Sequence, residues 1–177
     1  MSTEIKKGEF TLKDKLQIPS GLLNAIIAGY QIALNKTLGS GAAAMTQLLI
    51  KDIGDFLEEM LENVGFEIHE IRELKYDVPR AFKMLGISDN VEVEIPSGSG
   101  TVEKDKYVIK IYDSIFKPAA RFLATKGIKF TLSPESFLAA AIIRKAIRKT
   151  KPNAQIKIKI HPHEKPQDPL VIEVIVR

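Results

Sequence analysis

The sequence predicts an α+β fold in which an antiparallel sheet of about four strands has one face covered by four to five helices. Apolar residues recur at helical spacing over 20–64 and 113–149, whereas they alternate with polar residues in four short segments: 91–95, 107–112, 155–160 and 170–176. Helices, two strands, helices and two strands follow in that order, which favours antiparallel pairing with one solvated face. Since no Pro/Gly/Ser-rich linker divides the 177 residues, we expect one domain over 1–177.

Two helices are expected in the first third of the chain, after a short strand or extended arm over 8–18. The first runs over 20–38 and the second over about 40–64, and Gly39 and Gly65 end them. The second helix is apolar on one face and acidic on the other. The first is apolar over more of its circumference than a monomer requires, so we expect part of it to meet a second copy of the chain.

The middle of the chain carries weaker signals. Residues 66–74 fit either a strand or a connecting loop. Residues 77–79 (Asp-Val-Pro) fit the start of a helix, and a short helix closed by Gly86 is expected over 79–85. Another is expected to start at the cap formed by 113–114 and to finish at Gly127.

The least ambiguous helix is Ser133–Lys149. Ser133 is a good N-cap, and Pro134 suits the first helical position, where no amide hydrogen bond is lost. An apolar run over 137–143 is wider than the stripe of a surface helix. We therefore expect a core helix here.

The composition excludes several classes of protein. Hydrophobic residues make up 45% and charged residues 27%, as in ordinary globular proteins. The first ten residues are polar, and no apolar run approaches the roughly 20 residues of a membrane span, so we expect a cytoplasmic protein. Without cysteine there are no disulfides, thiolate nucleophiles, iron–sulfur clusters or usual structural zinc sites. Abundant Ile, Lys and Glu with few Asn and Gln are typical of thermophiles.

The charge is unevenly distributed. Residues 51–73 hold eight acids and two bases, a net −6, and residues 141–165 hold eight bases and one acid, a net +7. Two solvated faces, or an acidic helix docked near a basic hairpin in one subunit, explain this better than nucleic-acid binding. Self-association through the opposite patches is an alternative.

Several phrases of the sequence resemble the vinyl-4-reductase domain family, whose wider superfamily includes small subunits of the TRAPP trafficking complexes. They are GEFTLKDKLQIPSGLLNAI, GSGAAAMTQLLIKDIGDFLEEML, VIKIYDSIFKPAARFL, and SPESFLAAAIIRKAIRK with IKIKIHPHEKPQDPLVIEVIVR. Together they cover most of the chain. The resemblance implies a small-molecule-binding module, commonly dimeric, with an apolar cavity between helices and sheet; family members are often called hydrocarbon-binding proteins, and related domains sense aromatic compounds.

The chain differs from this family at the positions of the metal ligands. Zinc-binding branches carry cysteines at the start of the last helix and in the final hairpin, with a nearby glutamate. Here 134–136 is Pro-Glu-Ser, and the chain has no cysteine. We therefore expect no metal and no cofactor, and the lipid-modified cysteine of some TRAPP subunits is missing as well.

Two sets of residues are candidates for binding. Six residues of helices that should pack together would line an apolar cavity: Ile26, Tyr30, Phe116, Phe122, Phe137 and Ala141. Five bases would form a positive surface: Arg148, Lys149, Lys151, Lys157 and Lys159. Phosphates would need only such charge, but the last two strands lack the aromatic residues on which single strands stack, so nucleic acid is not expected as a partner.

Other possible sites have simpler interpretations. His161, His163 and Glu164 are ligand types for zinc, yet neighbours on a Pro-containing turn need not converge, and we interpret them as a solvated turn. His69 has no evident partner. The stretch 97–100 lacks the Lys-Ser/Thr of a phosphate loop and fits a hairpin turn. The carboxylate pairs Glu58/Glu59 and Glu92/Glu94 should lie on exposed faces, where no burial would tune their pKa.

Two functional hypotheses follow from these patterns. The first is a non-enzymatic binding module for an apolar or amphipathic molecule, hydrocarbon- or lipid-like, that acts as a homodimer. The alternative is a dimeric interaction scaffold whose basic hairpin docks an acidic protein or nucleic acid. Catalysis is a third option that no constellation of residues in the sequence supports.

Overall fold

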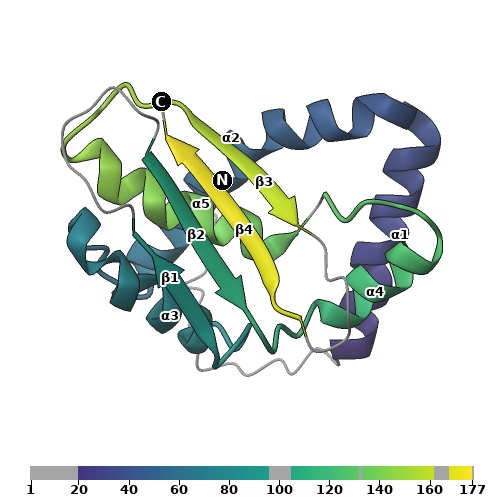
Figure 1. Ribbon diagram of the computed structural model, residues 1–177, viewed down its shortest axis with the longest axis horizontal. Helices are drawn as coiled ribbons and strands as arrows, with labels where there is room; N and C mark the ends of the chain where they lie inside the picture. Colours follow the sequence, from purple (N-terminus) through teal and green to yellow (C-terminus); the bar gives the residue numbers. More distant parts are fainter. Residues whose placement is uncertain (1–19, 96–104, 132, 162–167, 177) are drawn as a thin grey trace, which may run out of the picture.

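The computed structural model describes residues 20–95, 105–131, 133–161 and 168–176 (Figure 1). Its helices are α1 (Ser20–Leu38), α2 (Ala42–Asn63), α3 (Leu74–Met84), α4 (Lys117–Thr125) and α5 (Pro134–Arg148), with two short 3₁₀ helices, η1 (Gly39–Gly41) and η2 (Ile71–Glu73). The strands are β1 (Val91–Glu94), β2 (Asp105–Ile111), β3 (Ile156–His161) and β4 (Leu170–Val176). The predicted α+β class and order of elements are confirmed.

The four strands form one antiparallel sheet in the order β1-β2-β4-β3. Ile109 of β2 lies opposite Val93 on one side and Ile172 on the other, and Ile172 in turn lies opposite Ile160. The sheet lies in front in Figure 1, with α5, α2 and α3 behind it. One face is therefore covered by helices, and the alternating burial of β3 and β4 follows from this.

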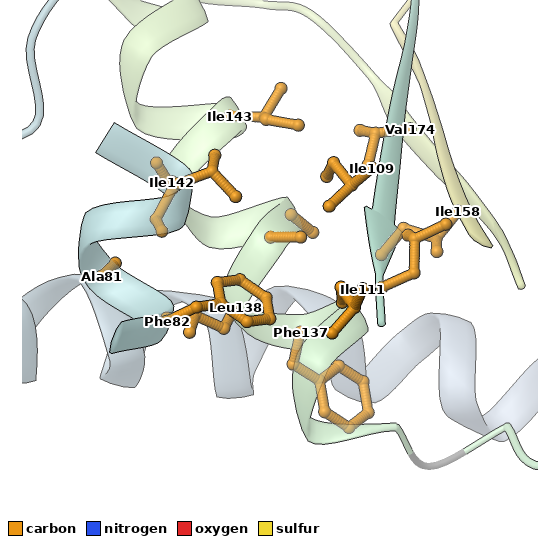
Figure 2. Close-up of a cluster of buried hydrophobic side chains, with 14 of the residues drawn as sticks. Ala81, Phe82, Ile109, Ile111, Phe137, Leu138, Ile142, Ile143, Ile158 and Val174 are labelled. Atoms are coloured by element: carbon orange, nitrogen blue, oxygen red, sulfur yellow. The ribbon is translucent and has the colours of Figure 1, made fainter. Parts of the chain in front are cut away.

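The hydrophobic core lies between the sheet and α5. Ile109, Ile111, Ile158 and Val174 point from the sheet toward α5 in Figure 2, where Leu138, Ile142 and Ile143 meet them. These three residues of α5 are at most 1% exposed, in keeping with the predicted core helix. Burying each Ile or Leu contributes about 1.5–3 kcal/mol, so these contacts between α5 and the sheet contribute substantially to stability.

The predicted helix ends follow local chemistry. Ser133 caps α5, since its hydroxyl accepts a hydrogen bond from the Ser136 amide at 3.1 Å. Gly39 and Gly65, which follow α1 and α2, have positive φ values of 52° and 75°. Residues with a β-carbon rarely adopt such angles, so glycine is the natural stop at both positions.

Two helix starts differ from expectation. α3 begins at Leu74, so Pro79 lies inside the helix and not at its start. The Asp77 carboxylate does not cap a helix; it accepts hydrogen bonds from the amide and ring of His69. α4 begins at Lys117, not at 113–114; the Ser114 hydroxyl accepts a hydrogen bond from the Phe116 amide at 3.0 Å and donates one to Glu135.

Three further predictions concern the arm, the turn and the ambiguous segment that follows α2. The arm over 8–18 and the turn at 97–100 lie outside the described residues. Residues 66–70 form the connection between α2 and η2, and Phe66 and Ile68 are buried in the core. Among the described helices, none combines the length and apolar character that crossing a membrane requires.

Candidate functional site

An apolar cavity of about 270 Å³ lies among the helices. Its walls come from α2, from α5 and from the segment that leads out of α3, and the lining residues are Ile53, Leu57, Leu85, Ile87, Pro134, Phe137 and Leu138. None of these seven side chains carries a polar group. The cavity therefore favours hydrocarbon over polar groups, and its lining offers no acid, base or nucleophile to a bound molecule.

The local sequence explains this wall. Ile53 and Leu57 are four residues apart, so they lie on the same face of α2. Phe137 and Leu138 occupy the first turn of α5, whose start is fixed by the Ser133 cap and by Pro134. Gly86, with φ 66°, turns the chain between Leu85 and Ile87. The cavity thus sits where three apolar segments converge, beside the helices and not against a strand.

The six residues predicted to bind ligand are dispersed in the structure. Phe137 lines the cavity, and Phe116 and Ala141 are buried in the fold. Ile26 and Tyr30 on α1 are 46% and 70% exposed, and Phe122 on α4 is also exposed. The other lining residues were not singled out from the sequence, although the helical spacing of Ile53 and Leu57 and the apolar run containing Leu138 were visible signals.

A buried carboxyl group lies one residue from the cavity wall. Glu135 is 1% exposed, and its carboxylate accepts hydrogen bonds from the hydroxyls of Ser114 and of Ser133, the latter at 2.7 Å. Burial raises its pKa above the ordinary value, and these hydroxyl donors oppose that rise. Both oxygens are occupied by the protein itself, so this carboxyl joins the start of α5 to the segment before α4.

A second polar cluster holds the connection between α2 and α3. The Asp77 carboxylate accepts hydrogen bonds from the His69 amide at 2.7 Å and from Arg80 at 3.2 Å, and it lies 3.0 Å from His69 Nδ1. Asp77 is 2% exposed. The expectation that His69 has no partner is therefore wrong. A His–Asp pair can orient a base, but Arg80 and the His69 amide share the same carboxylate, as in a structural clamp.

Acidic α2 and basic α5 pair within the chain. Arg144 Nη2 lies 2.7 Å from Asp55 Oδ1 and 2.9 Å from Glu58 Oε1, and Arg148 reaches Glu58 at 3.4 Å. Lys145 pairs with Glu62. Glu58 is 8% exposed, so the prediction of an exposed face was wrong for this residue: its partner lies on another helix. The two-sided charge of the sequence is partly neutralised inside one subunit.

The five predicted basic residues occupy different settings. Arg148 faces the acids of α2, and Lys149 Nζ donates to the Ile68 carbonyl at 2.8 Å. Lys157 and Lys159 are exposed on β3, while Ile158 on the opposite face is buried, as the alternation predicts. Lys151 is exposed after α5.

The proposed metal ligands are only partly described. His161 Nε2 lies 3.4 Å from Glu173 of the neighbouring strand, whereas His163 and Glu164 lie outside the described residues. A hydrogen bond from Lys106 lowers the pKa of Glu173, and His161 adds to that effect. Within the described part of the chain, no group of three or more His, Asp or Glu residues is placed to hold a metal ion.

Comparison with known proteins finds a sequence relative and similar solved structures. The chain is 37% identical over 150 residues to the Uncharacterized protein MJ0312 of Methanocaldococcus jannaschii, which covers 79% of this chain and 69% of that protein. No protein-family model matches the chain, so the resemblance to the vinyl-4-reductase family stays a prediction.

One similar solved structure is a trafficking protein particle complex subunit 3 from Naegleria fowleri, covalently bound to palmitic acid. It is 15% identical, and the alignment covers 91% of this chain and 96% of that chain with a TM-score of 0.49. Similarity at this level carries no argument about the function of this chain.

Proposed function

We propose that this chain, which belongs to the same family as the Methanocaldococcus jannaschii protein MJ0312, is a non-enzymatic module that binds an apolar or amphipathic small molecule. One observation carries this proposal, the cavity of about 270 Å³ whose seven lining residues are all apolar. At about 270 Å³ the cavity is slightly smaller than the roughly 300–1,000 Å³ of typical ligand pockets, so we expect it to hold a small hydrocarbon or part of a longer alkyl chain.

The chemistry of the walls defines the ligand. Burial of apolar surface contributes about 25 cal/mol per Å², and no wall residue can compensate a charge or an amide placed inside. The part of the ligand inside the cavity must therefore be uncharged hydrocarbon. A polar head, where the ligand has one, would have to remain in water.

A titration with a fluorescent fatty acid tests this proposal. Ile53→Phe places a larger side chain in the cavity and should weaken binding at least tenfold. Met84→Phe is the matched control, since Met84 is 37% exposed on α3 and does not line the cavity; it should bind like the wild type. Equal binding by all three proteins would place the ligand elsewhere, and an absence of binding in all three would contradict the proposal.

We propose further that the module acts as a homodimer, because α1 exposes large apolar side chains. The alternative of a scaffold that docks an acidic partner has a narrower basis. Lys157 and Lys159 are exposed, but Arg148 faces Asp55 and Glu58 of the same chain. Nothing in the arrangement of these bases favours a nucleic acid over an acidic protein.

A further inference from the structure

Helix α1 buries two polar side chains and exposes several large apolar ones, although Ala28 is buried and Leu23, Ile27 and Ile32 pack partly against the core. Asn24 and Gln31 are 6% and 1% exposed, whereas Leu22, Ile26 and Tyr30 are 54%, 46% and 70% exposed. A surface helix of a monomer normally shows the opposite arrangement. Apolar packing of Ala28, Leu23 and Ile27 therefore accounts for only one side of α1, and hydrogen bonds from its two buried polar residues help to set its orientation.

Two side-chain amides fix this orientation. Asn24 Nδ2 donates to the Ile115 carbonyl at 2.7 Å, and Asn24 Oδ1 accepts from the Ala119 amide at 2.9 Å. Gln31 Oε1 accepts from the amide and the hydroxyl of Thr131 at 3.0 and 3.1 Å. Rotating α1 to bury its apolar face would break all four bonds. The part of the chain that the structure describes therefore leaves this apolar face uncovered.

We propose that α1 packs against α1 of a second copy of this chain, with Gly29 at or near the point where the two helices cross. This inference rests on the proposed homodimer and assigns its interface. In the part of the chain that the structure describes, Lys36 is the first charged residue of α1, so two copies of this face would meet without like-charge repulsion.

The exposed apolar area is sufficient for a dimer. Four large side chains of α1 and three of α2 are at least 39% exposed: Leu22, Ile26, Tyr30, Leu38, Met45, Leu48 and Phe56. An aromatic side chain can bury about 150–250 Å² and an aliphatic one roughly half of that, so at these exposed fractions the seven side chains offer on the order of 500 Å² of apolar surface. A standard stable interface buries about 800 Å² per partner, about 65% of it apolar in homodimers, so the exposed apolar area of α1 and α2 together approaches that requirement.

Gly29 lies in the middle of this face. Ala25, Gly29 and Ala33 are each four residues apart, all three are exposed, and a β-carbon added to Gly29 would meet nothing within 4 Å. Small residues allow helix axes to approach to the lower end of the usual 8–10 Å. The α-carbons of two Gly29 residues would then come within the roughly 7 Å that a disulfide requires.

Light scattering of the full chain tests the assignment through a charge placed on this face. The wild type should run at twice the 19.7 kDa of one chain. Tyr30→Glu should weaken dimerisation at least a hundredfold, because each copy would bring an unpaired charge into the interface. Tyr76→Glu is the matched control, since Tyr76 is 59% exposed on α3, and it should remain dimeric.

Cysteine crosslinking gives an independent test, because the chain has no cysteine of its own. Gly29→Cys should form a covalent dimer under mild oxidation, and Tyr76→Cys should not. A wild-type dimer that survives Tyr30→Glu and does not crosslink through Gly29→Cys would place the interface elsewhere and overturn this assignment while the homodimer stands. A monomeric wild type would overturn both, and ligand binding would still be tested separately by Ile53→Phe.

Discussion

Replacing Gly54 with alanine tests the packing of α2 against α5, because we expect this substitution to destabilise the protein where it would ordinarily stabilise a helix. Gly54 lies in the interior of α2, where replacing glycine with alanine ordinarily stabilises a helix by about 1 kcal/mol. A β-carbon at this position would lie 2.7 Å from Arg144 Nη2 and 3.1 Å from Arg144 Cζ. The guanidinium would have to move away from the two carboxylates that it contacts.

The magnitude follows from the bonds at risk. Arg144 is held by Glu58 and Asp55, and the side chains of Arg144 and Glu58 are each 11% exposed. Losing one charged hydrogen bond here costs about 1.5–3 kcal/mol, which exceeds the gain in helix propensity. We expect Gly54→Ala to lower the free energy of unfolding by about 1 kcal/mol.

A double-mutant cycle isolates this contact. In an Arg144→Ala background the obstruction is gone, so Gly54→Ala should raise the free energy of unfolding by about 0.5–1 kcal/mol. Urea unfolding at one fixed protein concentration measures all four proteins, since dimerisation would otherwise shift the midpoints. Equal stabilisation by Gly54→Ala in both backgrounds would refute the close packing of Arg144 on α2.

Three further predictions concern other parts of the fold. Because burial raises the pKa of Glu135, the folded state holds the Glu135 proton more tightly than the unfolded state, and this proton stabilises the fold at low pH; the stabilisation is lost as pH rises through the folded-state pKa. In urea unfolding from pH 5 to pH 8, the free energy of unfolding should therefore fall less for Glu135→Gln than for the wild type. Equal falls in the two proteins would contradict this. Asn24→Ala should lower the free energy of unfolding by about 1–3 kcal/mol because the Ile115 carbonyl and Ala119 amide lose their partner, whereas Asn35→Ala on the exposed side of α1 should change it by less than about 0.5 kcal/mol. Gel-shift assays at physiological salt should show no DNA or RNA binding, and exchanging Lys151, Lys157 and Lys159 for Glu should leave the melting temperature within a few degrees of wild type; tight, salt-sensitive binding that this variant loses would instead favour the scaffold.

The fold could be predicted because its signals are local. Alternation of apolar and polar residues predicts the strand Leu170–Val176, and the Ser133 cap with the wide apolar run predicts the core helix that follows it. The glycines at 39 and 65 ended their helices as expected, since positive φ is a property of the residue itself. The start of α3 was predicted wrongly, because Asp77 and Pro79 were taken as a helix start. Both lie inside α3, and Asp77 binds His69, a contact between separate segments that local helix-start rules do not include.

The candidate site was harder to predict because it depends on which faces meet. Ile26 and Tyr30 have the spacing of core residues, and their exposure follows from the bonds of Asn24 and Gln31 to distant segments. The cavity likewise arises where Leu57 and Leu138 converge from separate helices. Periodicity marks an apolar face, but it does not tell what that face will contact.

Native mass spectrometry of the purified full chain tests the central claim most directly. We predict that the wild type, after incubation with a fatty acid, carries a non-covalent adduct that dissociates on activation in the gas phase. Met84→Phe should carry the same adduct, and Ile53→Phe should carry little or none, because Ile53 lines the cavity and Met84 does not. A wild-type spectrum without adduct, or one indistinguishable from that of Ile53→Phe, would contradict the assignment of this cavity as a ligand site.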